Sequence, residues 1–322
     1  MLSSTPTRRA LLGAGALALL LTATACAGTN AGAGAAEPGA ATVKVGYFPL
    51  VHTATAVHAS EAGVFSKNGI NVELVQTQGG ATAIPTLVSG NIDVTYTNYT
   101  SVLLAKHKGI PLTIISGNDV GVEDHGIFVK KDSGIESIAD LKGKKFAVNN
   151  LQNIGTIAIT SLLEEAGLQR GDVEIIEMPY PDMQAALDSG NTDAIWQVEP
   201  FQASAKTNGF TKIGNLFDGP VADMPVAGWI TTEKFAKENP EAIKAFKASI
   251  GESAKELQDN RDELVKLVPT FTKVTAEVVK QIEMPKFTSD IDNDQLAKAA
   301  ELMHKYGIID KPLDVGTLLP NE

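Results

Sequence analysis

Cysteine is almost absent from this chain, which has a single thiol, Cys26, in 322 residues. One cysteine cannot form an intrachain disulfide, and the five histidines show no metal-ligand spacing with one another. A phosphate-binding loop is also missing, because Gly143-Lys144-Lys145 lacks the preceding glycine-rich turn. No nucleophile is paired with a base in a recognisable motif. The chain is therefore predicted to be no enzyme and to hold no metal or other cofactor.

Basic side chains are scarce as well. Lysine and arginine total 27 against 38 aspartates and glutamates, a net charge of −11. Without Arg8 and Arg9, which lie in the N-terminal segment, the charge is about −13. This acidic balance argues against nucleic acid as a partner and against capture of anionic lipid head groups. Only Arg170 and Arg261 remain beyond that segment, and neither is placed to clamp an anion with two hydrogen bonds.

No apolar run is long enough to span a bilayer. Arg8 and Arg9 precede the apolar residues 10–21, which lead through small residues to Cys26. This order is typical of a signal peptide, which we place at residues 1–25. Residues 7–12 resemble a twin-arginine export signal.

Cys26 directly follows this apolar run, in the tetrapeptide Ala23-Thr24-Ala25-Cys26. The tetrapeptide resembles the lipobox of bacterial lipoproteins, although Ala23 replaces the usual leucine. We expect lipidation of Cys26; the alternative is an ordinary signal cleaved near Ala25 or Ala27. Residues 26–42 have little to bury and would form a flexible tether. The protein would then be exported and held at the outer face of the cell membrane by its lipid alone.

The remaining chain contains the same order of predicted elements twice, about a hundred residues apart. In each copy a strand, a helix, a strand and a helix lead into a Ser-Gly-Asn-x-Asp turn. The first copy has strands 43–47 and 72–75, helices 54–62 and 84–88 and the turn 89–93; the second has strands 145–148 and 173–177, helices 156–166 and 182–187 and the turn 189–193. Coincidence is the alternative, because Gly-Asn turns are common before strands. Two similar α/β lobes would leave a ligand cleft between them, while the turns themselves would set up strands and not touch the ligand.

Strands alternating with helices indicate mainly parallel sheets covered on both faces, so the predicted fold class is α/β. Short apolar strands at 126–130 and 226–231 are predicted to carry the chain between the lobes as two hinges. The first lobe would comprise residues 43–127 and 224–322, and the second residues 128–223. After Glu233 the pattern is purely helical, with Pro240 near one helix start, Pro269 ending the next and Gly307 stopping the last helix at 297–306.

Four stretches together resemble one family. They are GYFPLVH at residues 46–52, GIESIADLKGKKFAV at 134–148, DAIWQVEPF at 193–201 and TEKFAKENP at 232–240. They are similar to the solute-binding lipoproteins of ABC importers for nitrate, taurine and alkanesulfonates, a group that includes thiamine-pyrimidine precursor binders. The resemblance extends over residues 42–316. It implies a periplasmic-binding-protein fold with two hinge strands, and it is weak for the identity of the ligand.

Ligands of open α/β sheets bind beyond the carboxyl ends of the strands, so the loops at those ends are the candidate ligand-binding segments. The candidates in the first lobe are Tyr47, His52, Gln78, Gly79, Gly80, Thr97, Asn98 and Asn118. Those in the second lobe are Asn149, Asn150, Gly155, Thr156, Tyr180, Gln197 and Glu199, with Trp229 near the return crossing.

These candidates are mostly amides, hydroxyls and aromatics, which suit a small polar ligand with one flat or apolar part. The helix starts at Gly79-Gly80 and at Gly155-Thr156 could point free N–H groups at an anionic oxygen, or serve only as caps. His52 is equally a ligand contact or a half-buried capping residue. Glu199 would suit an amine such as that of taurine or an aminopyrimidine, or be structural.

The function predicted from the sequence is that of an extracytoplasmic solute-binding component of an ABC importer. It would close as a monomer on a small organic solute, first a sulfonate or taurine-like compound, and deliver it to a membrane permease with a cytoplasmic ATPase. Two alternatives stay open: an aromatic or pyrimidine-type solute, or a surface receptor that presents its ligand to a sensor kinase.

Overall fold

A computed structural model describes residues 42–319 of the chain. The predicted signal peptide, Cys26 and nearly all of the predicted tether lie outside the described residues. Within residues 42–319, no helix combines the length and apolarity needed to cross a bilayer.

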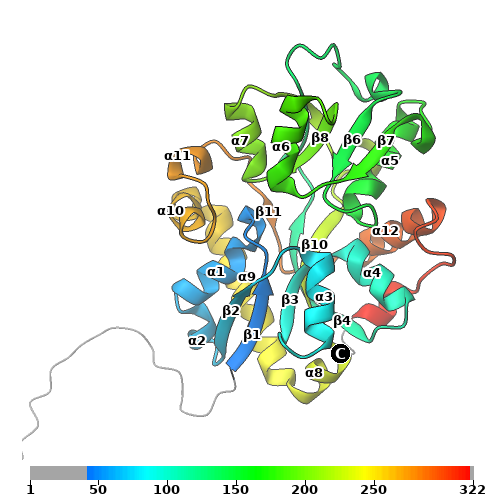
Figure 1. The fold of residues 1–322 in the computed structure, drawn as a ribbon. Coiled ribbons are helices and arrows are strands. Elements are labelled where there is room, and N and C mark those ends of the chain that lie inside the picture. Colours follow the sequence, from blue (N-terminus) through cyan, green and yellow to red (C-terminus); the bar gives the residue numbers. More distant parts are fainter. Residues whose placement is uncertain (1–41, 320–322) are drawn as a thin grey trace, which may run out of the picture. The chain divides into compact units, whose positions relative to one another are not determined.

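The first sheet has the strand order β11-β4-β10-β3-β1-β2 (Figure 1). Strand β1 runs parallel to β2 and β3, whereas β10 is antiparallel to β3 and β4. The strands are β1 (Thr42–Tyr47), β2 (Asn71–Gln76), β3 (Val94–Asn98), β4 (Leu112–Val120), β10 (Pro225–Thr232) and β11 (Lys286–Phe287). Every residue of β3 except its last is buried, as expected for a strand covered on both faces.

The second sheet has the order β7-β6-β8-β5-β9. Strand β6 is parallel to β7 and β8, and β5 is antiparallel to β8 and β9. The strands are β5 (His125–Val129), β6 (Lys145–Val148), β7 (Glu174–Glu177), β8 (Ala194–Val198) and β9 (Thr211–Asn215). The chain thus forms two α/β lobes, which confirms the predicted fold class.

Helices pack on both sheets and complete the lobes (Figure 1). Those from the first-lobe segments are α1 (Ala54–Glu61), α2 (Val64–Lys67), α3 (Gly80–Val88), α4 (Tyr99–His107), α8 (Glu233–Glu238), α9 (Pro240–Asp259), α10 (Arg261–Phe271), α11 (Ala276–Val279) and α12 (Asn293–Lys305). The second lobe has α5 (Ile154–Glu165), α6 (Tyr180–Ser189) and α7 (Phe201–Thr207). Local sequence fixes several starts: Asn98 caps α4, Asn153 caps α5, and Pro240 occupies the first turn of α9.

The internal repeat extends to individual hydrogen bonds. In the first lobe the Asp93 carboxylate accepts from Lys44 N, and Asp93 N donates to Lys44 O, both at 2.8 Å. In the second lobe Asp193 makes the same pair of bonds with Lys145, at 2.8 and 3.0 Å. Each turn therefore ties the start of its lobe's last parallel strand to the start of the first one. As predicted, the turns serve strand pairing.

The two crossings between the sheets lie slightly earlier than predicted. Residues 126–130 were expected to form a hinge strand, but β5 pairs with β8 and β9 and belongs wholly to the second sheet. The first crossing therefore occupies residues 121–124, between β4 and β5. The return occupies residues 216–224, because β10 already pairs within the first sheet. Antiparallel pairing, which an apolar run does not reveal, accounts for the shift.

The C-terminal third is not purely helical. The two-residue strand β11 pairs with β4, so that Lys286 lies opposite Val120 and Phe287 opposite Asp119. A strand of this length has no readable periodicity, which explains why the sequence did not predict it. The remaining predictions for this part are close: Pro269 lies in the last turn of α10, and Gly307, with φ of 71°, follows α12.

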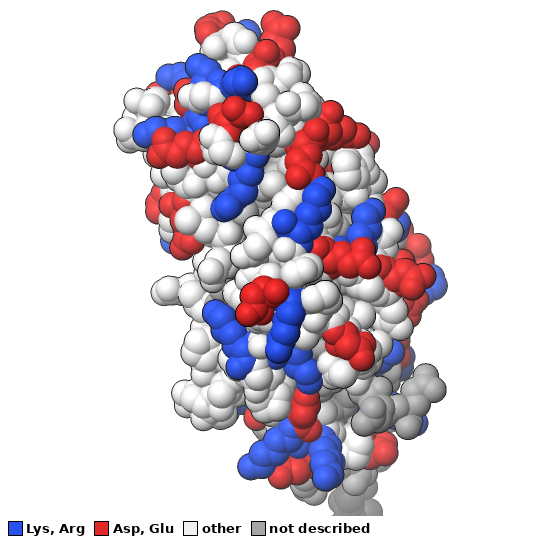
Figure 2. All heavy atoms as spheres, turned by 90° about the vertical axis from the view of Figure 1, so that its right-hand side faces the viewer, with Lys and Arg blue, Asp and Glu red and all other residues white. Residues whose placement is uncertain are grey.

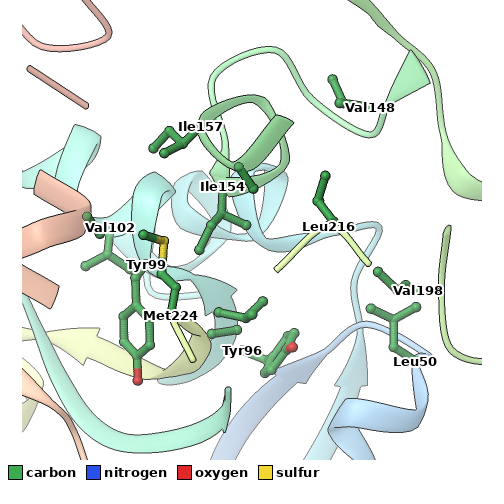
Figure 3. Packing of buried hydrophobic residues seen from close by; sticks show 14 of the residues in the cluster. Leu50, Tyr96, Tyr99, Val102, Val148, Ile154, Ile157, Val198, Leu216 and Met224 are labelled. Atoms are coloured by element: carbon green, nitrogen blue, oxygen red, sulfur yellow. The ribbon is translucent and has the colours of Figure 1, made fainter. Parts of the chain in front are cut away.

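Buried apolar side chains of both lobes belong to one cluster (Figure 3). Leu50 and Tyr96 come from the first lobe, and Ile154 and Val198 from the second. The surface, by contrast, mixes both signs of charge on the face drawn in Figure 2. An exposed ion pair such as Lys305–Glu164, which joins α12 to α5 at 2.5 Å, contributes less than about 1 kcal/mol to stability.

Candidate functional site

A small cavity of about 50 Å³ lies where loops at the carboxyl ends of the strands of both lobes meet. Residues of both lobes form its wall, with both sheets contributing aromatic side chains. The lining residues are Phe48, Leu50, His52, Gly79, Tyr96, Asn98, His125, Asn149, Asn153, Ile154, Tyr180, Trp196, Val198, Val226 and Ala227. We call this space the inner cavity.

A larger groove of about 590 Å³ adjoins the inner cavity. The two spaces share the residues Phe48, Gly79, Asn98, Asn149, Asn153 and Tyr180. The other residues of this outer groove are Gln76, Thr77, Gln78, Thr82, Asn150, Glu177, Pro179, Pro181 and Lys273. Lys273 is the one lysine or arginine among the described residues that line either space.

Three asparagines place amide groups where the inner cavity meets the outer groove. Asn98 ends β3 and accepts a hydrogen bond from Ser101 N at 2.9 Å, which fixes its side chain at the start of α4. Asn153 caps α5 by accepting from Gly155 N at 3.0 Å, and its Nδ2 donates to the Asn149 side chain at 2.5 Å. The amide pair is therefore held in one orientation before any ligand enters.

The aromatic wall of the inner cavity is set by ring packing. The Trp196 ring stacks on His125 with centroids 5.8 Å apart and meets the Tyr180 ring edge-on at 5.3 Å. Gly155 makes room for it, because a Cβ atom there would lie 2.2 Å from the indole. The predicted role of Gly155 as a backbone donor to the ligand gains no support from its position, whereas its lack of a side chain lets Trp196 reach the cavity.

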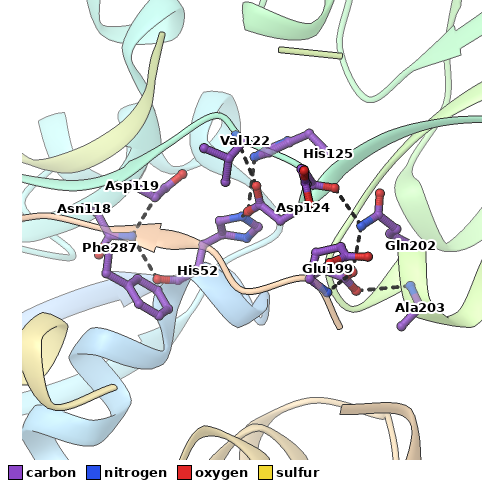
Figure 4. A network of polar contacts seen from close by, with 12 residues as sticks. His52, Asn118, Asp119, Val122, Asp124, His125, Glu199, Gln202, Ala203 and Phe287 are labelled. Carbon is purple, nitrogen blue, oxygen red and sulfur yellow. Dashed lines mark hydrogen bonds and ion pairs between the residues drawn. The ribbon is translucent and has the colours of Figure 1, made fainter. Parts of the chain in front are cut away.

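A cluster of buried titratable groups underlies the inner cavity (Figure 4). Asp124 lies between two imidazoles, with its Oδ2 2.7 Å from His52 Nε2 and 3.6 Å from His125 Nε2. The imidazole rings are 5.2 Å apart, centroid to centroid. The spacing argument from the sequence therefore fails for His52 and His125, which the fold brings together.

Asp119 is the second carboxylate of the cluster. Its Oδ1 accepts from Tyr96 Oη at 3.0 Å and from Asn118 Nδ2 at 2.7 Å. Asn118 is itself held by Trp229 Nε1, which donates to Asn118 Oδ1 at 2.9 Å. These bonds hold Asp119 through Oδ1, and no hydrogen-bond partner of its Oδ2 is found among the described residues.

Burial and charge oppose each other in this cluster. Burial alone would lower the pKa of His52, but the Asp119 carboxylate and the hydrogen bond to Asp124 outweigh it and raise that pKa. Burial lowers the pKa of His125 to about 4. Burial raises the pKa of Asp119, whereas the two histidines overcome the burial of Asp124 and lower its pKa. His52 and Asp124 form the closest contact between titratable groups of the cluster, at 2.7 Å.

Glu199 lies outside both spaces, fully buried at the start of α7. Its carboxylate accepts from Gln202 Nε2 at 2.8 Å, Ala203 N at 3.1 Å and Glu283 N at 3.0 Å. Burial nevertheless raises the pKa of Glu199 to about 7. Since Glu283 precedes β11 of the first lobe, this carboxylate joins the two lobes away from the cavity.

The structure separates the sequence-predicted contacts into two groups. Those that line the inner cavity or the outer groove are His52, Gln78, Gly79, Asn98, Asn149, Asn150 and Tyr180. Those that line neither space are Tyr47, Thr97, Asn118, Gly155, Thr156, Gln197, Glu199 and Trp229, and the contacts of Gly80 lie outside what the structure describes. Several of the second group bond within the core instead, as when Gln197 Nε2 donates to Trp196 O and Thr156 Oγ1 to Asn150 O.

Sequence reasoning missed most of the aromatic and apolar wall. Phe48, Tyr96, His125 and Trp196 line the inner cavity without having been nominated. The repeat contained a usable signal: Tyr96 and Trp196 each stand three residues after the aspartate of their Ser-Gly-Asn-x-Asp turn. Because Tyr96 and Trp196 occupy equivalent positions in two facing lobes, the repeat could have predicted both as residues that line the cavity.

Comparison with known proteins places these features in a family context. A model of the family described as "NMT1/THI5 like" matches residues 51–264. The putative aliphatic sulfonates-binding protein of Bacillus subtilis (strain 168) is 26% identical over 264 residues, which cover 80% of this chain and 78% of the relative. The taurine-binding periplasmic protein of Escherichia coli (strain K12) is 23% identical over 242 residues, 74% of each chain.

A solved structure shares the fold. The crystal structure of the periplasmic aliphatic sulphonate binding protein SsuA from Escherichia coli superposes with a TM-score of 0.74. It has 19% sequence identity, and the match covers 87% of this chain and 92% of that one.

Proposed function

Because the chain belongs to the NMT1/THI5-like family, we propose that it is the extracytoplasmic solute-binding component of an ABC importer. It binds a small aliphatic sulfonate, with taurine-like compounds as the first candidates, and delivers it to a membrane permease with a cytoplasmic ATPase. It binds the solute as a monomer and releases it chemically unchanged.

The observation that carries this proposal is an inner cavity walled by two lobes, between which the chain crosses twice within residues 42–319. Movement of one lobe about such crossings opens and closes the cavity, which is the usual hinge mechanism of solute capture. One relative is named a putative aliphatic sulfonates-binding protein and another a taurine-binding periplasmic protein, which supports the choice of solute.

The walls suit an anion with a short apolar tail. The amides of Asn98, Asn149 and Asn153 can donate to sulfonate oxygens, and Gly79 adds the backbone at the start of α3. The tail would extend from the inner cavity into the outer groove, between Phe48 and Tyr180. Lys273 in the groove offers a positive charge at a distance.

Titration of the purified protein with taurine, alkanesulfonates, nitrate and uncharged aromatic compounds tests the proposal. We expect sulfonates to bind, and Asn149→Ala to weaken their binding at least about tenfold because a ligand oxygen loses an amide donor. Calorimetry measures the affinity, and Asn293→Ala, an exposed amide on α12, is the matched control. Binding of uncharged aromatics alone, or equal affinity in both variants, would contradict the proposed solute site.

Attachment to the membrane is a separate part of the proposal and depends on Cys26, outside the described residues. We infer that export is followed by cleavage before Cys26 and acylation of its thiol. Replacement Cys26→Ala is expected to abolish incorporation of labelled fatty acid. It should also move the protein from the membrane fraction to the soluble one, because the predicted tether of about 16 residues would then have no lipid at its start. Ser66→Ala in the described body serves as control. Equal labelling of the Cys26→Ala protein would rule out this anchor.

A further inference from the structure

Three side chains of metal-binding type converge under the inner cavity. His52, Asp119 and His125 each offer one ligand atom, and these atoms lie within 4.8 Å of one another. All three residues are 1% exposed. They come from three separate segments: His52 precedes α1, Asp119 lies in β4 and His125 begins β5 (Figure 4). The first crossing, at residues 121–124, separates the last two.

Each described residue of this trio has at least one ring nitrogen or carboxylate oxygen without a hydrogen-bond partner. Among the described residues, His52 Nδ1, Asp119 Oδ2 and both ring nitrogens of His125 are buried side-chain atoms without a hydrogen-bond partner. A buried polar group left unpaired costs about 1–3 kcal/mol, so several at one place call for an occupant. Neither a proton nor a single hydrogen bond would satisfy four such atoms at once.

The groups behind the trio are those that orient metal ligands. Asp124 accepts from His52 Nε2 at 2.7 Å, which fixes the tautomer that presents a lone pair on Nδ1. Tyr96 and Asn118 donate to Oδ1 of Asp119 and leave Oδ2 available. A carboxylate behind one imidazole and two donors on the ligating carboxylate form the supporting layer that a metal site requires.

Two imidazoles and one carboxylate fit a first-row divalent ion such as Zn²⁺ with one position left open. Ligand bonds of about 2.0–2.2 Å put tetrahedral ligand atoms about 3.3 Å apart, so the ligand atoms, now within 4.8 Å of one another, would approach by at most about 1.5 Å. The open position would face the inner cavity, because His52 and His125 line it while Asp119 lies behind Tyr96.

We propose that His52, Asp119 and His125 bind a divalent transition-metal ion beneath the inner cavity, and that this ion supplies the positive charge for the solute's anionic head. The second half rests on the proposed function. No lysine or arginine is among the described residues that line the inner cavity, and the buried Asp119 and Asp124 would repel a sulfonate. A bound divalent ion would offset these two negative charges and place a positive centre beneath the inner cavity.

The first experiment uses Zn²⁺ alone. Chelator-treated mature protein is titrated with Zn²⁺ in competition with a chromogenic chelator, and Co²⁺ absorption reports coordination number. We expect one ion per chain, about 10–100-fold weaker binding in Asp124→Asn, and a larger loss in each of His52→Gln, Asp119→Asn and His125→Asn. His304→Asn, a histidine on α12 outside the cluster, is the control and should bind as the wild type does. Folding is checked by circular dichroism; Asp124→Asn, which removes no ligand, tests the site should a ligand variant fail to fold.

The second experiment titrates an alkanesulfonate into metal-free and Zn²⁺-loaded protein. Binding at least about tenfold tighter in the loaded protein is expected. Zn²⁺ binding that is absent, or unchanged in all four cluster variants, overturns the metal site. Equal sulfonate affinity with and without Zn²⁺ overturns the link to the solute while the proposed function stands. If sulfonate binds neither the metal-free nor the Zn²⁺-loaded protein, the proposed function is overturned. The Zn²⁺ titration still tests the metal site independently.

Discussion

Raising the pH from 4.5 to 7 is expected to cost the folded protein about 3 kcal/mol of unfolding free energy through Glu199 alone. Burial raises the pKa of this carboxyl from 4.5 to about 7, so the folded state holds its proton over a range in which the unfolded state has lost it. A carboxyl whose pKa is raised by folding stabilises the folded state fully below pH 4.5. That contribution is lost as the pH rises through 7.

The surroundings of Glu199 explain why its ionised form is costly. Its three hydrogen-bond donors favour the carboxylate, but they do not offset complete burial, and the charge of Asp124 adds to the cost. Lys206 is close in sequence, yet it pairs with Glu283 at 2.6 Å. Lys212 is another basic side chain whose charge interacts with Glu199, and burial lowers the pKa of Lys212. Glu199 therefore has no ion-pair partner among the described residues.

The variant Glu199→Gln isolates this contribution. Its amide cannot ionise, and one hydrogen bond, that from Ala203 N, is lost at every pH. Urea unfolding at pH 4.5 and pH 7 should therefore show a wild-type curve that falls relative to the variant by about 3 kcal/mol. Glu136→Gln, at an exposed carboxylate, should run parallel to the wild type. A wild-type-minus-variant difference that is the same at both pH values would refute the assignment.

Much of the fold follows from local signals in the sequence. The repeated turn, the alternation of strands and helices and the helix caps were each readable, because they depend on residues close together in the chain. The Ser-Gly-Asn-x-Asp turns are the clearest case: they were predicted to set up strands, and their aspartates bond to β1 and β6. The crossings and β11 were misplaced or missed because antiparallel partners come from distant segments.

The candidate site was predictable as a region and not as a set of contacts. The rule that ligands bind beyond strand carboxyl ends led to His52, Asn98 and Asn149, which do line the inner cavity. The same rule could not tell a side chain that faces the cavity from one that turns into the core, as Gln197 does. Grouping of His52 with His125 depends on the crossing between β4 and β5, which no sequence spacing encodes.

Replacement of Trp229 by alanine is expected to lower the unfolding free energy by about 4 kcal/mol. The indole is fully buried, meets Phe246 and Tyr96 edge-on at 5.5 and 5.6 Å, and donates to Asn118. Its removal leaves a cavity behind Tyr96, because packed neighbours relax only in part. Trp229→Phe keeps most of the packing and should cost about 1 kcal/mol for the lost hydrogen bond, since Thr55 still donates to Asn118 Oδ1 at 2.6 Å. Urea unfolding followed by far-ultraviolet circular dichroism measures both values.

The same variants separate a core role for Trp229 from the ligand contact that the sequence suggested. The chain has two tryptophans, so Trp229→Phe leaves Trp196 as the sole indole, and Trp196 lines the inner cavity. Its fluorescence can then report solute binding directly. Because Trp229 lines neither the inner cavity nor the outer groove, we expect solute affinity to change less than about threefold in Trp229→Phe. A tenfold loss of affinity with little loss of stability would instead mean that Trp229 reaches the solute when the lobes close.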